Sequence, residues 1–380
     1  MEFLFWFLIS ICIYGYIGYP LLLAIITPYF SRYQQLPQSI STGPSVSVLV
    51  AAYNEEKNIA IKIDSLLSQT YPSSDFDIWV LDDGSDDRTA EIVKNYDDQR
   101  VNLLSLPRGG KATALNAGVA SSTKEIIVFS DADNEWTENT LMRLISPFSL
   151  LSVGAVSGHL SIRKNSKHLG IGDRLYRQYE AFIRKCETKL GNAVSADGGI
   201  FAIRRVLYQD LPQDVTDDFY ISTGAIINGQ SLVYQETAVA YDDGVDNAGN
   251  QLRRRIRVTV RGMTSLWRRR ELFNIFRYGV YSFCLFSHKL IRRFVPFFAI
   301  LLLPVNIFVL HNGGFYIALF SLQIGFYLCA VAGLIDNGRR LPKSFSMAGF
   351  VLLSSFGLAS GIVQFLLGKR FTFWSPEENR

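Results

Sequence analysis

The chain of 380 residues has little cysteine: four residues, with no short spacing between any two of them. Cys12, Cys284 and Cys329 lie in apolar surroundings, and Cys186 stands alone in a stretch of mixed composition. Zinc sites and disulfide frameworks need closely spaced or paired cysteines, which this pattern does not provide. We therefore interpret all four as small buried apolar residues.

Two glycine patterns of nucleotide-binding proteins are also missing. Neither G-x-G-x-x-G nor G-x-x-x-x-G-K-[ST] follows the first strand-like run, SVSVLVAA. Those patterns cradle phosphates in dinucleotide-binding folds and in P-loop proteins. Their absence disfavours a dinucleotide-dependent enzyme and a P-loop ATPase.

Charged residues are absent from four segments, which are 3–31, 294–310, 312–335 and 345–368. Each is long enough, or nearly so, to cross the hydrocarbon layer of a membrane. The first has no basic leader and no A-x-A-like cleavage site, so we predict a retained anchor and not a signal peptide.

Basic residues are concentrated in the segment 250–293, which holds twelve Lys or Arg against the single acid Glu271. Such a cluster beside a membrane span normally marks the cytoplasmic face. We therefore predict that residues 33–290 are cytoplasmic and that Met1 is outside. Three later spans would place the end of the chain outside, so one apolar stretch is expected to be re-entrant or to lie flat.

These observations predict five regions along the chain. They are a transmembrane anchor (1–32), a cytoplasmic domain (33–250), basic interfacial helices (251–290), a membrane region of two to three spans (291–370) and a tail (371–380). In the stretch 272–290 aromatic and polar residues alternate, which favours a helix lying in the membrane interface. We interpret His288 as an interface residue and not as a catalyst.

The cytoplasmic region repeats a plan of apolar strand, polar turn and helical pattern. The plan occurs in "SVSVLVAAYNEEKNI", in "FDIWVLDDGSDDRTAEIV", from Val101 through "PRGGKATALNAGV", and in "IIVFSDADNEW". Strands that alternate with helices predict an α/β fold with a parallel sheet and right-handed crossovers. Ligands of such sheets bind at the carboxyl ends of the strands.

Every one of these units places polar residues at that end. They are Tyr53, Asn54 and Glu55, then Asp82 and Asp83, then Lys111, then Asp131 and Asp133. Four polar turns at one sheet edge predict a site. Gly109 and Gly110 would let the backbone approach an anion, and the following helix would add its amide groups and the charge of Lys111.

The pair Asp131 and Asp133 has two interpretations. Alternate residues of an extended chain point the same way, so both carboxylates could face one spot and hold a cation between them. An acidic turn after a strand is the other interpretation, and it is the more frequent one for an isolated D-x-D.

The ordered series of motifs resembles the inverting family 2 glycosyltransferases, which have a GT-A nucleotide-sugar-binding fold. The motifs are "AAYNEE", "LDDGSDDRT", "GGKATALNAG", "DAD", "SADGGIFAIRR" and "VTDDF", followed by a basic helix and apolar segments. The resemblance covers residues 45–270 closely. It implies a mostly parallel sheet flanked by helices, with transmembrane helices at both ends and an interfacial amphipathic region.

The resemblance implies a donor site and a base. Asp133 would hold Mg²⁺ or Mn²⁺, with Asp131 near the metal and the ribose or sugar, while Tyr53, Glu55 and Asp82 or Asp83 would grip uracil and ribose. Those roles imply a UDP-sugar donor. The pair Asp217 and Asp218 matches the acidic pair of the family, and the second residue would be the general base. The alternative for Asp217 is an N-cap of the following helix.

Two further segments match the family and carry residues suited to the acceptor or to the diphosphate. In "SADGGIFAIRR", Asp197 is a possible partner of an acceptor hydroxyl, and Gly198 and Gly199 suit either a close approach to the acceptor or a bulge. Arg254, Arg257 and Arg261 are spaced at i, i+3 and i+7, which places them on one helix face suited to a diphosphate.

Processive members of the family carry Gln-x-x-Arg-Trp in that helix, whereas this chain reads Arg254-Arg255-Ile256-Arg257-Val258. The missing Trp, which helps to form the acceptor platform, argues against processive polymerisation. For Arg268, Arg269 and Arg270 we favour contact with anionic headgroups.

The sequence therefore predicts a membrane-bound glycosyltransferase of the plasma membrane. It would move a sugar from a UDP-sugar to a lipid-linked or saccharide acceptor in surface polysaccharide or glycolipid synthesis, with no nucleic-acid partner. One alternative is a processive synthase similar to cellulose, hyaluronan or poly-N-acetylglucosamine synthases. A second alternative is an inactive sugar-binding scaffold.

Overall fold

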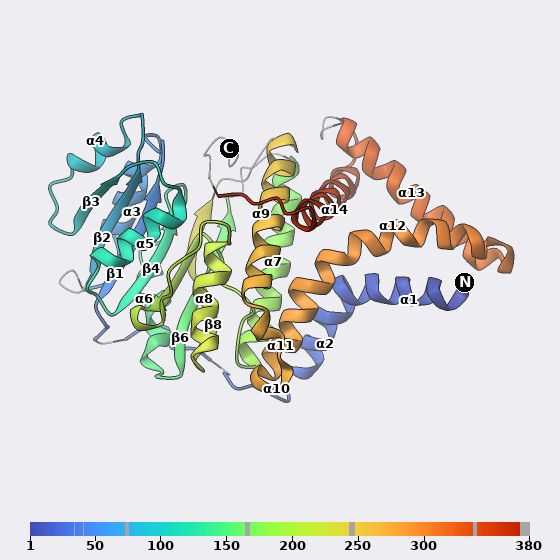
Figure 1. Ribbon diagram of the computed structural model, residues 1–380, viewed down its shortest axis with the longest axis horizontal. Coiled ribbons are helices and arrows are strands. Elements are labelled where there is room, and N and C mark those ends of the chain that lie inside the picture. Colours follow the sequence, from blue (N-terminus) through green and yellow to red (C-terminus); the bar gives the residue numbers. More distant parts are fainter. Residues whose placement is uncertain are drawn as a thin grey trace.

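The computed structural model describes residues 1–33, 35–40, 42–72, 76–163, 168–242, 248–336 and 340–372. It contains an α/β domain and a group of long apolar helices (Figure 1). Of the predicted tail, residues 373–380 lie outside the described residues.

The centre of the domain is one mixed sheet of eight strands in the order β3-β2-β1-β4-β7-β6-β8-β5. The strands are β1 (Val46–Ala52), β2 (Phe76–Asp83), β3 (Val101–Leu106), β4 (Ile126–Asp131), β5 (Glu135–Trp136), β6 (Val153–Ile162), β7 (Ile200–Arg204) and β8 (Ser231–Asp242). Strands β3, β2, β1 and β4 are parallel, as the repeated strand and helix plan predicts. Strand β7 runs antiparallel to both β4 and β6, and β6 is parallel to β8.

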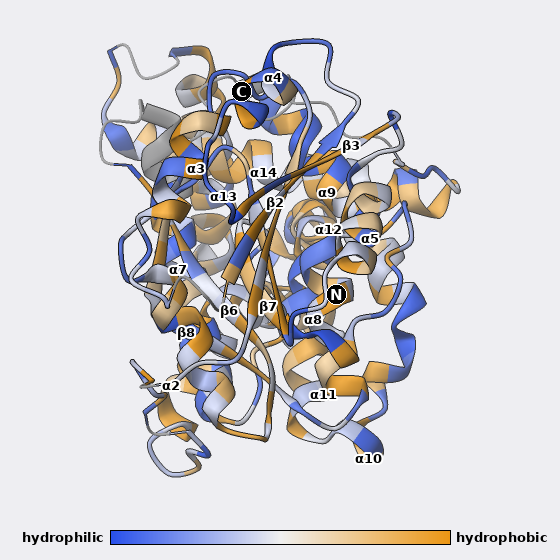
Figure 2. Ribbon diagram, turned by 90° about the vertical axis from the view of Figure 1, so that its left-hand side faces the viewer, coloured by the Kyte–Doolittle hydropathy of each residue, from blue (hydrophilic) through white to orange (hydrophobic). Residues whose placement is uncertain are grey.

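Both faces of the sheet are covered, which explains why its strands are apolar on both sides. In β1, Val46, Val48 and Val50 face one core, whereas Leu49 and Ala51 face the other. Helices α3 (Ile59–Leu67), α4 (Thr89–Lys94) and α6 (Thr140–Ile145) cover the first face, and α5 (Lys111–Ser121) and α8 (Asp217–Ile227) cover the second. Figure 2 shows hydrophobic colouring along β2, β6 and β7 and hydrophilic loops around α4.

Further helices pack beyond α8 (Figure 1). They are α7 (His168–Lys189), α9 (Ala248–Arg268), α1 (Glu2–Ile13), α2 (Tyr19–Ile26), α12 (Arg292–Val309), α13 (Gly314–Asp336) and α14 (Lys343–Leu366). Among the described residues, four continuous helical stretches are long and apolar enough to cross a membrane: Glu2–Ile26, Val280–Asn312, Gly314–Asp336 and Lys343–Leu366. They coincide with the four predicted apolar segments.

Helix α14 differs from the other apolar helices in its direction. Figure 1 shows α14 nearly end-on, whereas α1 and α13 run across the view. Helix α14 packs closely on α9, because a Cβ added at Gly361 would lie 3.1 Å from the carbonyl oxygen of Ile256. The chain then returns to the domain, where the carbonyl oxygen of Thr372 lies 3.2 Å from the position of a Cβ at Gly110.

The predicted interfacial helix over 272–290 is wrong in detail. The segment is divided at Gly279 into α10 (Ile275–Tyr278) and a second helix, which begins with α11 (Val280–Leu285) and continues through a π-helical turn (Phe286–Ile291) into α12. Asn274 caps a new helix by accepting from the amides of Phe276 and Arg277, and Gly279 has a positive φ of 54° that ends it. These two residues interrupt what the aromatic pattern suggested was one helix.

His288 is also placed differently from the prediction. It is 3% exposed and lies between two buried glutamates, 2.7 Å from Glu187 and 3.1 Å from Glu180. A buried acid pair holds the ring, so His288 joins α7 to the start of α12 and does not face the membrane surface.

Candidate active site

The D-x-D pair lies at the carboxyl end of β4, as predicted. Asp131 is the last residue of β4, and Asp133 follows in the turn before β5. Both line a cavity of about 250 Å³ at the sheet edge. Lys111, the first residue of α5, donates to Asp131 with its Nζ 2.6 Å from Oδ1.

The structure brings most of the predicted site residues to this cavity. Its lining includes Glu55, Lys111, Asp131, Asp133, Asp218, Arg254 and Arg257. Tyr53, Asp82 and Asp83 are not among its lining residues and lie beside it.

The glycine turn that follows β3 is built around Asp83, the last residue of β2. Its carboxylate accepts from the amides of Gly109 and Gly110, at 2.7 and 2.9 Å, and forms an ion pair with Arg108. Gly110 has a φ of 89°, which explains a glycine at this position. The two glycine amides therefore bind a carboxylate of the protein itself.

Of the predicted nucleoside-gripping residues, Tyr53 packs against that same turn, and Asp82 and Glu55 are held within the loops after β2 and β1. The guanidinium of Arg108 lies 3.5 Å from the centre of the Tyr53 ring. The carboxylate of Asp82 accepts from the amide of Ser85 at 3.2 Å, and Glu55 accepts from the Asn58 side chain at 2.6 Å. The loops after β1 and β2 are thus held in fixed positions beside the cavity.

The acidic pair begins helix α8. The N-cap of this helix is Thr216, and Asp217 is its first residue, so the alternative interpretation of Asp217 as the N-cap is wrong. The carboxylate of Asp217 lies 2.7 Å from Nζ of Lys111. Asp218 lies against Gly198, where an added Cβ would be 3.8 Å from the Cβ of Asp218.

The environment of Asp218 favours its protonated form. Burial raises the pKa of this carboxyl above its ordinary value, and the negative charge of Asp217 raises it further, against an opposing effect of Lys289. A carboxyl whose pKa is moved toward neutral pH is suited to accept a proton from a hydroxyl group.

The arginines of α9 converge on the same cavity. Arg254, Arg257 and Arg261 all line it, as their helical spacing predicts, and Arg261 also donates to the carbonyl oxygen of Val215 at 2.8 Å. Arg257 is 7% exposed. Val258, at the position of the missing tryptophan, lines the cavity as well.

The prediction that three later arginines face headgroups is wrong for Arg269. This side chain is buried, lies 3.8 Å from the ring centre of Tyr220, and donates to Gln209 at 2.8 Å. Arg268 is exposed and pairs with Asp214 at 2.8 Å.

Asp197 lines the cavity but is already engaged by cations. Its carboxylate lies 2.7 Å from Arg184 and 4.0 Å from Arg177. Burial alone would raise the pKa of Asp197, but these two guanidinium groups hold it below its ordinary value.

Lys62 is a functional candidate that the sequence did not reveal. It is 1% exposed, and its Nζ donates to Ser130 at 2.6 Å and to the Asn134 side chain at 2.8 Å. These residues flank the D-x-D pair on both sides. Asn134 in turn donates to the carbonyl oxygen of Gly199 at 2.9 Å, so one buried network joins the D-x-D turn to the glycines before β7.

Asp242, at the end of β8, is a second residue that the sequence did not reveal. It lines the cavity with Asp131 and Asp133. Burial and the charge of Asp133 raise its pKa to about 7, partly opposed by Arg177. The signal was an acidic turn, "YDDG", but the strand before it was not predicted.

The donor set of the cavity fits a hard divalent cation. Asp131 and Asp133 supply carboxylate oxygens, and the carboxyl of Asp242 lines the cavity with them. Within the described residues, no three Asp, Glu, His or Cys side chains form a metal cage by themselves. Mg²⁺ is commonly held by one or two carboxylates together with substrate phosphates and water.

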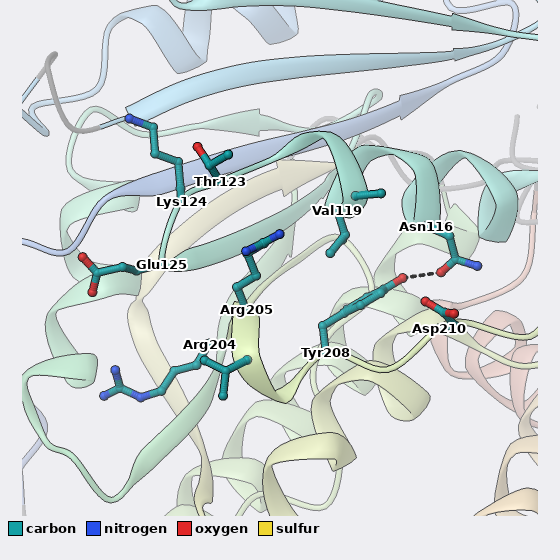
Figure 3. Close-up of a pocket in the computed structure, with 11 residues that line it drawn as sticks. Asn116, Val119, Thr123, Lys124, Glu125, Arg204, Arg205, Tyr208 and Asp210 are labelled. Carbon is teal, nitrogen blue, oxygen red and sulfur yellow. Dashed lines mark hydrogen bonds between the residues drawn. The ribbon is translucent and has the colours of Figure 1, made fainter.

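Another cavity, of about 530 Å³, lies away from this chemistry (Figure 3). It is lined by Lys124 and Glu125, which precede β4, and by Tyr208, which donates to Asn116 at 2.5 Å. It therefore lies at the opposite end of β4 from Asp131.

Residues 47–211 match the family model described as "Glycosyl transferase family 2". The segment 47–211 is therefore a domain of glycosyl transferase family 2. The matched residues of the family 2 domain contain the loops after β1 and β2, the glycine turn, the D-x-D pair and the Gly198–Gly199 turn.

Relatives of the family 2 domain include enzymes named for polysaccharide and glycolipid synthesis. The chain is 28% identical over 268 residues to poly-beta-1,6-N-acetyl-D-glucosamine synthase of Staphylococcus epidermidis, covering 67% of this chain and 64% of the relative. It is 32% identical over 168 residues to beta-monoglucosyldiacylglycerol synthase of Trichormus variabilis, covering 43% and 36%. The matched region thus spans less than two thirds of the length of these relatives.

A solved structure with little sequence identity to this chain has a similar fold. A mannosyltransferase from Pyrobaculum calidifontis, in complex with GDP-Man and Mn²⁺, superposes with a TM-score of 0.73 at 20% identity. The likeness covers 96% of this chain and 99% of that one. It confirms a GT-A-like mostly parallel sheet with flanking helices and apolar helices at both ends.

Proposed function

We propose that the protein is a membrane-bound inverting glycosyltransferase that moves a sugar from a UDP-sugar to a lipid-linked or saccharide acceptor. One observation carries the proposal: the D-x-D carboxylates, the acidic pair of α8 and the arginine face of α9 line one cavity. The family 2 match and the names of the relatives support the same reaction class.

The donor would bind between the D-x-D turn and α9. Asp133 and Asp131 would hold Mg²⁺ or Mn²⁺, which supplies charge neutralisation for a diphosphate. Arg254 and Arg257 would bind the diphosphate from the opposite wall with paired N–H donors. Tyr53, Glu55 and one of Asp82 or Asp83 would position the nucleoside.

The acceptor would lie against the glycine turn before β7. Asp218, which lies beside Gly198, would remove the proton of the attacking hydroxyl while the glycosidic bond to the diphosphate breaks on the opposite side. Asp217 would hold Lys111, and Lys111 would hold Asp131, so that the base and the donor carboxylate keep a fixed spacing.

The membrane arrangement is part of the proposal. We infer that α1 with α2, α12 and α13 cross the bilayer, and that α14 lies along its cytoplasmic surface. The packing of α14 on α9 and the approach of Thr372 to Gly110 support this topology, because both place the end of the chain on the side of the domain. The basic residues of 250–293 then face the cytoplasm.

A processive synthase is the second candidate, favoured by the similarity to poly-beta-1,6-N-acetyl-D-glucosamine synthase. Val258 stands where processive members carry tryptophan and offers no aromatic surface to hold a chain end. We therefore expect release of the product after one sugar or very few. Long chains at early times and low conversion would promote the synthase instead.

The test is a screen of nucleotide-sugars for release of nucleoside diphosphate by the purified full-length protein in detergent, with a lipid extract as acceptor. We expect release with a UDP-sugar that depends on Mn²⁺ or Mg²⁺. If no nucleotide-sugar gives release above that of the heat-denatured protein, the chain is a sugar-binding scaffold and the proposed activity is refuted.

A further inference from the structure

A separate cavity of about 360 Å³ lies on the membrane side of α9. Its walls come from α7, α9, the start of α12 and α14. Val258 lines both this cavity and the active-site cavity, so the two are neighbours. Any molecule held there would therefore lie next to the site of sugar transfer.

The charged residues that line this cavity are mostly cations. They are Arg255, Lys289, Arg292 and Arg293, with Glu180 as the acid and His288 between them. Glu180 lies 2.7 Å from Arg292 and 3.1 Å from His288, so its charge is shared between those two. Four cations, of which Arg292 is buried and the others are partly exposed, face one carboxylate among the described lining residues, and an anionic ligand would stabilise this arrangement.

Three buried polar atoms in the lining have no hydrogen-bond partner within the described part of the chain; one is Oε1 of Glu180, which lies in the ion pair with Arg292, and the other two are donors. Arg292 is 6% exposed, and its second terminal nitrogen, Nη1, is buried without a hydrogen-bond acceptor. The hydroxyl of Ser354, on α14, is also buried without a partner. Buried donors are normally satisfied, so these two groups indicate an acceptor that enters from outside.

The cavity also has an apolar part. Phe350, Val351 and Leu358 of α14 line it, and the guanidinium of Arg255 lies 5.5 Å from the centre of the Phe350 ring. The charge-free run 294–310 begins directly after Arg293, which places the cations at the boundary of the apolar layer. A ligand that fills both parts has an anionic group joined to a hydrocarbon chain.

We propose that this cavity binds the phosphate of a membrane-embedded acceptor, so that the sugar is transferred to a phosphate-bearing amphiphile. This inference rests on the proposed glycosyltransferase function and names its acceptor class. The phosphate lies among Arg292, Arg293 and Ser354, and the hydrocarbon chain lies along α14. The acceptor hydroxyl extends past Val258 toward Asp218.

The binding test uses dodecyl phosphate and dodecanol as probes for the full-length protein in detergent. We expect the phosphate to bind at least about tenfold more tightly than the alcohol, because charge-assisted hydrogen bonds are among the strong ones. Arg293→Gln removes a charge, and Ser354→Leu fills the cavity without changing charge. Each should weaken phosphate binding about tenfold and leave UDP binding unchanged, which also shows that the variant is folded.

Matched controls lie outside the cavity. Arg277→Gln removes an exposed cation of the same basic segment, and Ser321→Leu adds an apolar side chain on the exposed face of α13. Both should bind dodecyl phosphate like the unmodified protein. Equal binding of phosphate and alcohol, or equal loss in controls and cavity variants, would overturn the site.

The transfer test identifies the acceptor. Sugar-labelled donor is incubated with the protein and a total lipid extract, and the labelled products are separated into anionic and neutral lipids. We expect the label in phosphate-bearing lipids. Label in neutral lipids alone would overturn the acceptor claim and leave the cavity as a site for bilayer phosphates. Donor turnover that fails with every extract would refute the proposed function, whereas the dodecyl phosphate measurement needs no donor and still decides the site.

Discussion

The ammonium group of Lys111 lies 2.7 Å from the carboxylate of Asp217. The same nitrogen lies 2.6 Å from Asp131, so one cation joins the D-x-D turn to the acidic pair of α8. Asp217 is thereby held in an ion pair, and its neighbour Asp218 is the carboxyl that faces Gly198 in the turn before β7. This arrangement separates a positioning acid from the proposed base.

The first prediction concerns the metal. Asp133→Asn should abolish sugar transfer and the Mn²⁺-dependent part of UDP binding, because an amide cannot replace a carboxylate ligand of a hard cation. Titration of UDP with and without Mn²⁺ checks this. Asp86→Asn, on an exposed part of the neighbouring loop, is the control. A variant that keeps full metal dependence would remove Asp133 from the metal site.

The second prediction concerns the base. Asp218→Asn should lower turnover by about 10²-fold or more while the affinity for UDP-sugar stays near normal, because a general base acts on the acceptor. Single-turnover kinetics and donor binding on the same preparation separate the two effects. A fall in donor affinity that parallels the fall in rate would assign Asp218 to the donor site.

The third prediction concerns pH. Burial and Asp217 raise the pKa of Asp218, and Lys289 and the more distant Asp197 also act on it. Activity should therefore fall as the pH drops through this raised pKa, above the ordinary aspartate value of 3.8. Asp217→Asn removes a negative charge, so the acid limb of kcat/KM should move to lower pH. A limb that stays in place, or moves up, would contradict the assignment.

The fourth prediction compares two arginines of α9. Arg257→Ala should depress turnover by about 10²-fold, because its side chain lines the cavity where a diphosphate would accumulate charge. Arg268→Ala, which loses an exposed pair with Asp214, should change turnover little. Steady-state kinetics at saturating donor measure both. An equal loss of turnover in the two variants would show that these arginines act only through net charge.

The fifth prediction concerns Lys62. Burial lowers its pKa to about 7 from 10.5, although Asp131, Asp133 and Glu135 oppose the shift. Between these two pH values the unfolded chain binds more protons than the folded one, so stability from this group should rise with pH. The thermal midpoint of the unmodified protein should rise relative to that of Lys62→Met over this range. Lys57→Met, at an exposed position, should show no such trend.

The parallel half of the sheet could be predicted because its signals are local. Apolar runs such as 126–129 mark the strands, and acids such as Asp131 and Asp133 mark their carboxyl ends. The helix face of Arg254, Arg257 and Arg261 followed from spacing alone. Each of these features depends on residues close together in the sequence.

The parts that were missed depend on contacts between distant segments. Lys62 resembles a surface lysine of an amphipathic helix, and its burial follows only from the packing of α3 behind the D-x-D turn. The position of Asp242 near the D-x-D pair follows only from the pairing of β8 with β6. Arg269 was assigned to the membrane surface from composition, whereas its position is set by the side chain of Tyr220.

The packing of α1 on α12 has a consequence for the folding of the domain that lies between them. Phe5 and Leu8 pack with Val305 and Val309, so two helices at opposite ends of the domain form a common apolar core. This contact ties the domain into a long closed loop, which restricts the unfolded chain more than the folded one. The free energy of unfolding of the domain should therefore be higher, and its refolding faster, when α1 and α12 remain packed together in the membrane. Detergents that separate α1 from α12 would weaken the catalytic domain without touching any residue of its cavity.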